Sequence, residues 1–302
     1  MISNRHIKGA AFAILAAGCW GMALVMSKSV LAACPPIPLL LSQLGASVLF
    51  LWVVLLLKKT ALPGIKSLLG VSLLGLLEPF LTYVLVLIGL TYSRASDAAL
   101  LQSLEPVFII VIGFVLFKER THKHVIYLSA LMLVGLYFSL GDSLSGLADN
   151  GLLGNALIIG GIVTAACYVV LTARAVAKAQ AIVIVTYQQS IALLAALFTF
   201  IVESIFSDDS FSLPDGGIGV LALFSGILQY ALAFTFFLAA LKHISAGLTG
   251  MFLNLIPVFG IVGAYLFLGE KMENVQIAGS AITIATLLAM SFLSGKAEGK
   301  QT

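Results

Sequence analysis

Charged residues are scarce in this chain, making up 10% of its 302 residues, whereas 61% are hydrophobic. An ordinary soluble domain is about 25% charged and about 45–50% apolar. A water-soluble fold could not cover so much apolar surface. The charges lie between long apolar runs, each close to the ~20 residues that a helix needs to cross the hydrocarbon core of a bilayer. The composition excludes a soluble globular protein and indicates a helical membrane protein.

Motifs for catalysis, redox chemistry and metal binding are also lacking. The three cysteines, Cys19, Cys34 and Cys167, have no metal or redox spacing and are interpreted as packing residues. No expected helix combines His, Asp and Glu or carries an activated serine. Without a Walker motif, ATP cannot be the direct energy source. The sequence therefore predicts that the protein is not an enzyme and has no metal or cofactor.

Long apolar segments follow one another with short connections between them. We expect ten helices, over residues 8–31, 36–57, 67–90, 95–117, 122–140, 151–173, 182–206, 216–240, 245–268 and 274–294. Short cytoplasmic loops retain lysine and arginine. With the N-terminus inside, all but three of the sixteen basic residues lie on the inner side, the exceptions being Lys28, Arg94 and Lys271. The pattern predicts a multi-pass protein of the cell's inner membrane with both termini in the cytoplasm.

The second half of the chain repeats the first. A shift of 151 residues superimposes Pro106-Val107-Phe108 on Pro257-Val258-Phe259 and Glu119 on Glu270. Because five helices per unit is an odd number, the second copy must cross the membrane in the opposite sense. We predict two inverted five-helix repeats, residues 1–145 and 146–302. Inverted repeats are typical of transporters that alternate between outward-open and inward-open states around a central site.

Two segments carry the repeat most clearly, LEPVFIIVIGFVLFKER (104–120) and LIPVFGIVGAYLFLGEK (255–271), and Cys19-Trp20-Gly21 lies in the first expected helix. With these segments the chain resembles the EamA family of the drug/metabolite transporter superfamily, and within it the YddG-type exporters of aromatic and neutral amino acids. The resemblance implies an all-α fold of ten transmembrane helices. It also implies a central cavity lined chiefly by helices 1 to 4 and 6 to 9, and export of amino acids or related metabolites.

Only two ionisable side chains lie near the middle of an expected helix, Glu78 and Glu105, and a proline follows each. A charge near the bilayer centre costs at least a few kcal/mol unless it faces a cavity or a partner. In one interpretation, a protonated glutamic acid donates to the carbonyl that the proline frees, at Gly75 or Gln102. In the other, the carboxylate binds a proton for coupling or the ammonium group of a substrate. We favour the second for Glu105, with Gln102 one turn away.

The second half offers uncharged counterparts. The repeat aligns Gln229 with Glu78, whereas Ile256 stands where the first half has Glu105. Asn254 aligns with Ser103 and shares a helix stripe with Gly247, Gly250 and Pro257. Such a stripe allows close helix packing or lets a helix hinge. Any proton or cation chemistry should therefore reside in the first half.

Aromatic residues lie at matching depths in the expected helices. Trp20, Tyr83, Tyr168 and Phe234 could stack on a substrate or bind an ammonium group by cation–π attraction, although packing explains each of them better when it is taken alone. The substrate role is favoured for Trp20 and Tyr168, which occupy similar positions in the first and sixth expected helices. We predict a midplane substrate site and three hinges. The site residues are Trp20, Glu78, Tyr83, Gln102, Glu105, Tyr168, Gln229 and Asn254, and the hinges are Pro79, Pro106 and Pro257.

All sixteen basic residues lie in loops or near helix ends, so none is available to neutralise a phosphate in the cavity. We predict a secondary exporter of small metabolites, chiefly neutral or aromatic amino acids. Export of other uncharged or cationic metabolites or drugs, and a channel or lipid scramblase, remain as alternatives. The expected partners are the substrate, the lipid bilayer and protons, with no nucleic acid. The expected oligomeric state is a monomer or a weak dimer.

Overall fold

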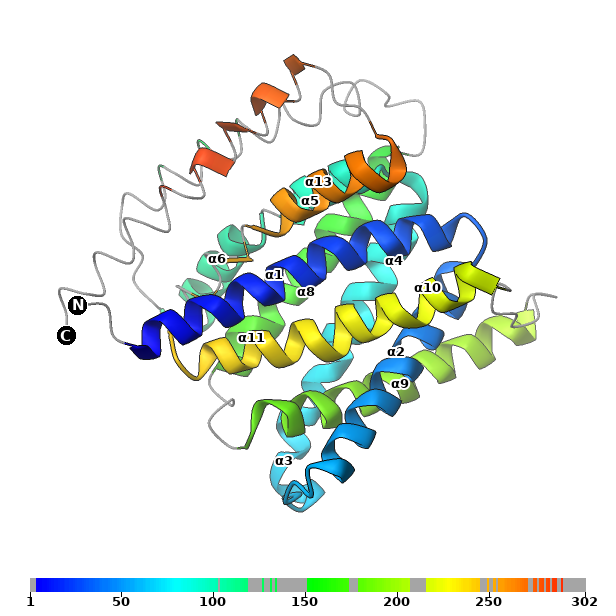
Figure 1. Ribbon diagram of the computed structural model, residues 1–302, viewed down its shortest axis with the longest axis vertical. Coiled ribbons are helices and arrows are strands. Elements are labelled where there is room, and N and C mark those ends of the chain that lie inside the picture. The colour runs from blue at the N-terminus through cyan, green and yellow to red at the C-terminus, as the bar shows by residue number, and fades with distance from the viewer. Residues whose placement is uncertain are drawn as a thin grey trace.

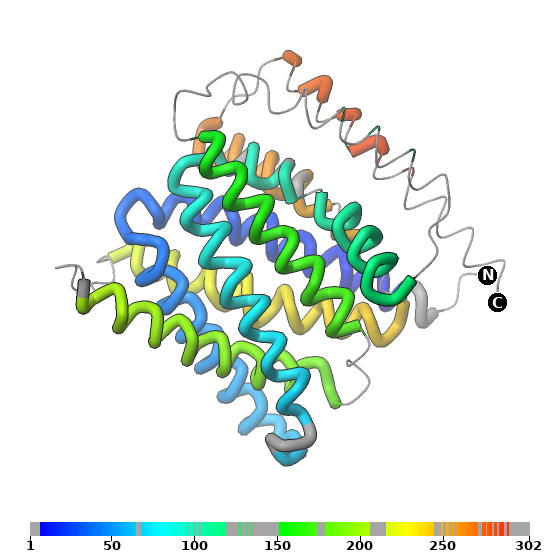
Figure 2. The backbone as a smooth tube through the Cα atoms, turned by 180° about the vertical axis from the view of Figure 1, so that it is seen from behind, coloured from blue at the N-terminus to red at the C-terminus, as the bar shows by residue number. Residues whose placement is uncertain are grey.

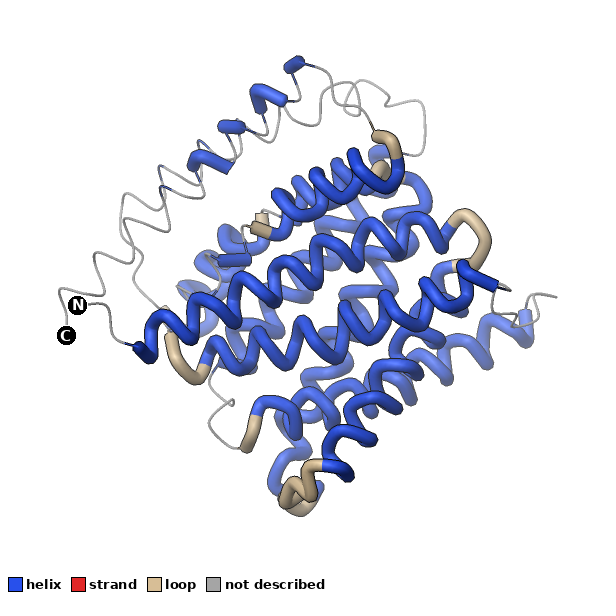
Figure 3. Tube along the Cα trace, in the orientation of Figure 1, coloured by secondary structure: helices blue, strands red, loops and turns tan. Residues whose placement is uncertain are grey.

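The computed structural model is helical, with no strand among the residues that it describes (Figure 3). These are residues 4–102, 104–118, 127, 131, 134, 151–173, 179–206, 216–244, 249, 252–253, 255–270 and part of the stretch 274–289. Within them, six helical stretches are long and apolar enough to cross a bilayer: Ile7–Leu31, Pro36–Leu57, Leu68–Tyr92, Gly151–Ala173, Ala181–Ile205 and Gly216–Leu241. The predicted all-helical, multi-pass architecture is confirmed at this level.

The first half begins with two uninterrupted helices, α1 (Asn4–Leu31) and α2 (Pro36–Leu57). Proline lies in the first turn of α2, where its missing N–H has no intrahelical partner to lose. The chain continues through α3 (Ile65–Ser72), η1 (Leu73–Leu76), η2 (Leu77–Leu81), α4 (Thr82–Tyr92), α5 (Ala95–Gln102) and α6 (Glu105–Phe117). The expected helix over residues 122–140 lies largely outside the described residues.

The second half begins with α8 (Gly151–Ala173) and α9 (Ala181–Phe206). It continues through α10 (Gly216–Gly226), η5 (Ile227–Leu232), α11 (Ala233–Leu241), α13 (Ile256–Gly263) and η6 (Ala264–Leu268). The beginning of the expected helix 245–268 and most of 274–294 lie outside the described residues. Both halves thus present long helices first and interrupted helices afterwards.

The third helix of the first half is interrupted, although the sequence predicts one continuous helix over residues 67–90. The interruption is the π-helical η2, in which Glu78 has extended backbone angles, φ −143° and ψ 125°, and precedes Pro79 through a cis peptide bond. Proline has no N–H to donate to the preceding turn. The π-helical η5 lies at the corresponding place in the second half, between α10 and α11. The predicted helix over residues 67–90 is confirmed as one helical stretch, Leu68–Tyr92, but it is broken at Glu78 rather than continuous.

The expected helix 95–117 is likewise two helices, α5 and α6, with Pro106 in the first turn of α6. Pro257 occupies the same place in α13. The turns before these prolines match: the Leu104 N–H donates to Leu101 O at 2.9 Å, and the Leu255 N–H donates to Phe252 O at 3.0 Å. Each predicted hinge proline, Pro79 included, thus lies at or next to a helix break.

The helices form one bundle in which helices of the two halves alternate. In Figure 1, α1 runs beside α10 and α11 of the second half. In Figure 2, the view from behind, α4 of the first half runs beside α8 of the second. The helix α2 packs on α9, α1 also packs on α13, and α6 packs on α8. Residues from both halves therefore surround the centre of the bundle.

Two glycines allow the closest of these contacts. A Cβ added to Gly75, in η1, would collide with the backbone of Gln188 in α9. A Cβ added to Gly226, at the end of α10, would collide with the backbone of Gln43 in α2. Backbone atoms cannot rotate away as a side chain can, so only glycine fits at either position. The two contacts correspond, because 151 residues separate the two glycines and each opposes the second helix of the other half.

Candidate functional site

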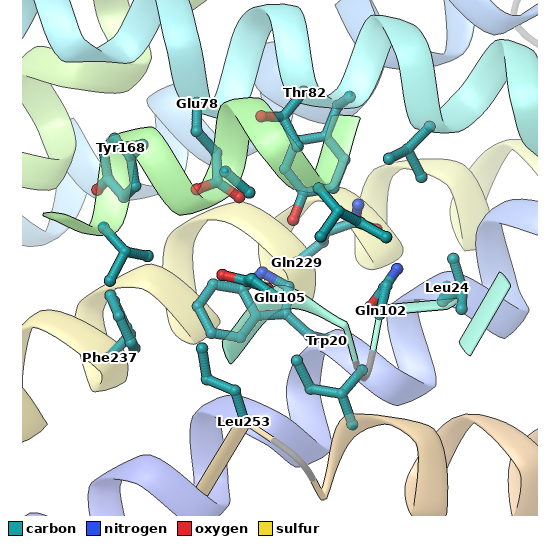
Figure 4. A pocket seen from close by; sticks show the side chains of 16 residues that line it. Trp20, Leu24, Glu78, Thr82, Gln102, Glu105, Tyr168, Gln229, Phe237 and Leu253 are labelled. Atoms are coloured by element: carbon teal, nitrogen blue, oxygen red, sulfur yellow. The ribbon is translucent and has the colours of Figure 1, made fainter. Parts of the chain in front are cut away.

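A small cavity of about 40 Å³ lies at the centre of the bundle (Figure 4). Side chains from both halves line it: Trp20, Leu24, Glu78, Thr82, Tyr83, Val86, Gln102, Glu105, Ile162, Ala165, Tyr168, Val169, Gln229, Phe237, Leu253 and Ile256. The helix breaks explain how polar residues reach it. Glu78 lies in η2, Gln102 ends α5, Glu105 begins α6 and Gln229 lies in η5.

The cavity is much smaller than a metabolite site. Ligand pockets commonly measure about 300–1,000 Å³, whereas 40 Å³ has room for roughly three water molecules. A substrate could enter only if the lining helices moved apart. The helix breaks beside the cavity offer places where such movement would disturb few backbone hydrogen bonds.

Most of the predicted site residues lie around this cavity. Seven of them line it: Trp20, Glu78, Tyr83, Gln102, Glu105, Tyr168 and Gln229. The eighth, Asn254, lies outside the described residues. Phe234 is not among the lining residues and packs behind them, edge-on to Trp20 at 5.1 Å and to Tyr168 at 5.8 Å between ring centroids.

The two glutamates approach the cavity from different elements and lie near each other (Figure 4). Glu78 is buried, and its carboxylate is close enough to Glu105 for a charge on one to act on the other. Two neighbouring carboxylates can together bind a proton or an ammonium group.

Aromatic side chains form one wall of the cavity. Trp20 is 9% exposed and meets the ring of Phe237 edge-on at 5.5 Å between centroids. Its Nε1–H is buried and has no hydrogen-bond partner among the described residues. Tyr83 and Tyr230 meet edge-on at 4.7 Å. The wall is therefore apolar in bulk but includes an unused hydrogen-bond donor.

A buried hydrogen-bond network behind the cavity was missed from the sequence. Gln43 Nε2 in α2 donates to Ser27 Oγ at 2.9 Å and to Ser225 Oγ at 2.7 Å. The Ser27 hydroxyl in turn donates to Gln229 Oε1 at 3.2 Å. The hydroxyl of Tyr230 donates to Gln43 Oε1 at 3.5 Å. Gln43 thus joins α1, α2, α10 and η5.

The helix α9 contributes a second part of this network. Gln188 Oε1 accepts from the Tyr168 hydroxyl at 2.9 Å, and its Nε2 donates to Val71 O at 3.1 Å. Gln189 Nε2 donates to Tyr230 O at 2.6 Å. Glutamine within an apolar segment was a signal that could have identified Gln43, Gln188 and Gln189, since such residues need partners in a membrane.

Charged groups join elements at one end of the bundle. Lys28 Nζ, near the end of α1, donates to Leu90 O and to Ser93 O, each at 2.7 Å. Glu270 Oε1, just after η6, accepts from the Ala95 N–H at 3.2 Å. These bonds connect α1 and the segment after η6 to the junction between α4 and α5, where the first half changes direction.

Comparison with known proteins identifies relatives for both halves. Residues 7–141 and residues 152–292 each match the EamA-like transporter family. The chain is 27% identical over 215 residues to the uncharacterized transporter YetK of Bacillus subtilis. The aligned residues cover 68% of this chain and 62% of YetK. It is 26% identical over 236 residues to the uncharacterized transporter YyaM of the same organism, covering 75% of this chain and 74% of YyaM. The match therefore spans less than two thirds of the length of YetK.

A shorter match and a solved structure add to this. Over 55 residues, 18% of each chain, the sequence is 38% identical to a probable terminal-alkyne amino-acid exporter of Streptantibioticus cattleyicolor. A crystal structure with 17% identity superimposes with a TM-score of 0.73 and covers 96% of this chain and 98% of that chain. At this identity the likeness concerns the fold alone. The family resemblance predicted from the doubled Pro-Val segments is confirmed.

Proposed function

The chain belongs to the EamA-like transporter family, and we propose that it is a secondary transporter that exports neutral amino acids, aromatic ones above all. The observation that carries the proposal is the central cavity, which combines two carboxylates with aromatic side chains. A carboxylate attracts the ammonium group that every amino acid carries. Aromatic rings provide a face for an apolar or aromatic side chain. The short match to a probable amino-acid exporter supports the same substrate class.

The lining also argues against anionic substrates. Among the described lining residues there is no lysine, arginine or histidine. A phosphate group would need such a partner in a low-dielectric cavity. Sugar phosphates and nucleotide sugars are therefore poor candidates. An uncharged or singly cationic metabolite remains compatible with the lining.

We further propose that the two halves are inverted repeats in a ten-helix fold, with both termini in the cytoplasm and the protein in the inner membrane. The contacts between helices support this organisation because they are reciprocal. The helix α1 packs on α11 as α8 packs on α4, and Gly226 opposes Gln43 as Gly75 opposes Gln188. The π-helical η2 and η5 also lie at corresponding places.

Such an arrangement favours alternating access. If each half can adopt the conformation of the other, the cavity opens first to one side and then to the other. The breaks at Pro79, Pro106 and Pro257 are the proposed hinges, since each of these prolines lies at or next to the end of a helix. The small volume of the cavity fits a conformation between the two open states.

Counterflow into proteoliposomes tests this function. Vesicles with purified protein are loaded with unlabelled phenylalanine, and accumulation of labelled amino acids from outside is followed for a panel of neutral, acidic and basic substrates. We expect saturable, transient accumulation of neutral and aromatic amino acids. Flux that rises linearly with concentration without saturation, or flux of ions or lipid, would indicate a channel or a scramblase instead.

A further inference from the structure

The cavity presents hydrogen-bond donors as well as carboxylates. The first is Trp20 Nε1–H, which lies in a side chain 9% exposed and has no partner in the described structure. A buried donor without a partner loses the full free energy of its hydrogen bonds to water. Such a group in a functional cavity indicates that a ligand supplies the missing acceptor.

The second donor is the amide nitrogen of Gln229. Its Oε1 already accepts a hydrogen bond from the Ser27 hydroxyl at 3.2 Å, so the oxygen is turned toward α1. The nitrogen has two N–H groups. Tyr83 also lines the cavity and is a neighbour to which one of them can donate. The other can donate to a ligand, because Gln229 lines the cavity.

Gln43 fixes this orientation from behind. A serine hydroxyl has one proton, and Ser27 accepts from Gln43 Nε2 at 2.9 Å, so its own proton is directed at Gln229. Gln43 cannot turn its amide around without losing its bond to Ser225, because the Ser225 hydroxyl donates its proton to Ala222 O at 2.8 Å and can only accept from Gln43. The relay Gln43–Ser27–Gln229 therefore presents nitrogen rather than oxygen to the cavity.

Acceptors lie close to these donors. Glu78 and Glu105 line the same cavity of about 40 Å³, so all four groups lie within a few ångströms of that space (Figure 4). An α-amino acid carries its ammonium and carboxylate groups on one carbon atom. Its recognition requires acceptors and donors side by side.

We propose that Trp20 Nε1–H and the amide nitrogen of Gln229 form a subsite for the substrate's carboxylate, next to the glutamates that bind its ammonium group. Ser27 and Gln43 are positioning residues for this subsite. The inference rests on the proposed function and makes it narrower: the substrates are free α-amino acids, and neither simple amines nor simple carboxylates satisfy the site. Neutral donors recognise the carboxylate here in place of lysine or arginine.

Fluorescence of Trp20 tests the subsite directly. The chain has two tryptophans, and a Trp52→Phe background leaves Trp20 as the only one. The purified protein in phospholipid nanodiscs is titrated with phenylalanine, 2-phenylethylamine and 3-phenylpropanoate. These ligands share one ring and differ in the two charged groups. We expect phenylalanine to shift the Trp20 emission and to bind at least about tenfold more tightly than either analogue, as one charge-assisted hydrogen bond requires.

Three variants of that background identify the relay. Ser27→Ala should reduce the preference for phenylalanine over 2-phenylethylamine to within about threefold, because Gln229 is no longer oriented. Gln229→Glu, of nearly equal shape, should reverse the preference, since a carboxylate repels the substrate's carboxylate. Ser29→Ala is the matched control: the Ser29 hydroxyl donates to Val25 O of its own helix, and the preference should stay as in the background.

Equal affinity for the amino acid and the amine, unchanged by Gln229→Glu, would overturn the carboxylate subsite. So would an absence of any change in Trp20 emission with all three ligands. Neither result would decide the proposed function, because counterflow measures transport independently of how the carboxylate is bound. A failure of counterflow with a full fluorescence response would instead contradict transport and leave the subsite supported.

Discussion

Replacing Gly226 by alanine should destabilise the folded protein, because the new Cβ would collide with the backbone of Gln43. The helices α10 and α2 would have to separate, and Gln43 is the residue that joins the network behind the cavity. Gly75→Ala should have a similar effect, since its Cβ would collide with the backbone of Gln188. Gly45→Ala, on α2, is the control because a Cβ there meets nothing within 4 Å.

The magnitude follows from two opposing effects. Overpacking a tight contact costs about 1–3 kcal/mol, and the upper part of this range applies when the opposing atoms belong to the backbone. Replacing a helical glycine by alanine also stabilises the helix by about 1 kcal/mol, which offsets part of this cost. We expect a net loss of about 2 kcal/mol for Gly226→Ala and a gain of up to about 1 kcal/mol for Gly45→Ala. The difference corresponds to about 6 °C in melting temperature at about 2 °C per kcal/mol.

Thermal unfolding in detergent, followed with a thiol-reactive dye, measures this difference. Cys19 and Cys167 are only partly buried and are replaced by alanine in all variants, which leaves Cys34; it is 3% exposed, so it reacts only when the bundle opens. Gly226→Ala and Gly75→Ala should melt several degrees below the wild type, and Gly45→Ala at or above it. Equal melting temperatures for Gly226→Ala and Gly45→Ala would show that α10 and α2 do not approach each other as closely at Gly226 as described.

Four further substitutions give separate tests. Glu105→Gln should lower counterflow of phenylalanine at least about tenfold, because it removes a charge-assisted bond to the ammonium group, and the melting temperature should stay unchanged. Counterflow at the wild-type rate in this variant would contradict the role of Glu105. Lys28→Met should lower the free energy of unfolding by about 1–2 kcal/mol in detergent melts, because two carbonyls at the end of α4 lose their donor, and an unchanged value would show these bonds contribute nothing. Lys118 and Gly269 both have left-handed backbone angles, with φ 54° and φ 66°. Lys118→Gly should therefore raise the free energy of unfolding by about 0.5 kcal/mol, and Gly269→Ala should lower it by about 1 kcal/mol. Changes of the opposite sign in detergent melts would contradict the assignment of these helix ends.

The sequence predicted the membrane-spanning stretches well because their signal is simple. A run of apolar residues near the length of a bilayer has few alternative explanations. The candidate site residues were found by a related argument: polar side chains such as Glu78, Glu105 and Gln229 are costly in lipid and tend to face the interior. The structure brings these three residues to one cavity.

What the sequence did not predict depends on contacts between distant segments. The interruptions at Glu78 and between Gln102 and Glu105 were expected only as bends, because proline is compatible with both a kinked and a broken helix. The network around Gln43 was missed because its partners lie far away in the chain; Ser225 is 182 residues distant. The periodicity of apolar residues within one helix indicates which face of that helix is buried. It does not indicate which residue of another helix contacts that face.

If the cavity opens alternately to the two sides of the membrane, a thiol placed in it can be reached from either face, and side-specific labelling measures this. Leu24 lines the cavity and is 3% exposed. Leu24→Cys is introduced after the three native cysteines are replaced, and membrane-impermeant thiol reagents are applied to oriented vesicles from either face. With alternating access we expect slow labelling from both faces and protection by phenylalanine from both. Labelling from one face only, or labelling that substrate does not reduce, would contradict alternating access through this cavity.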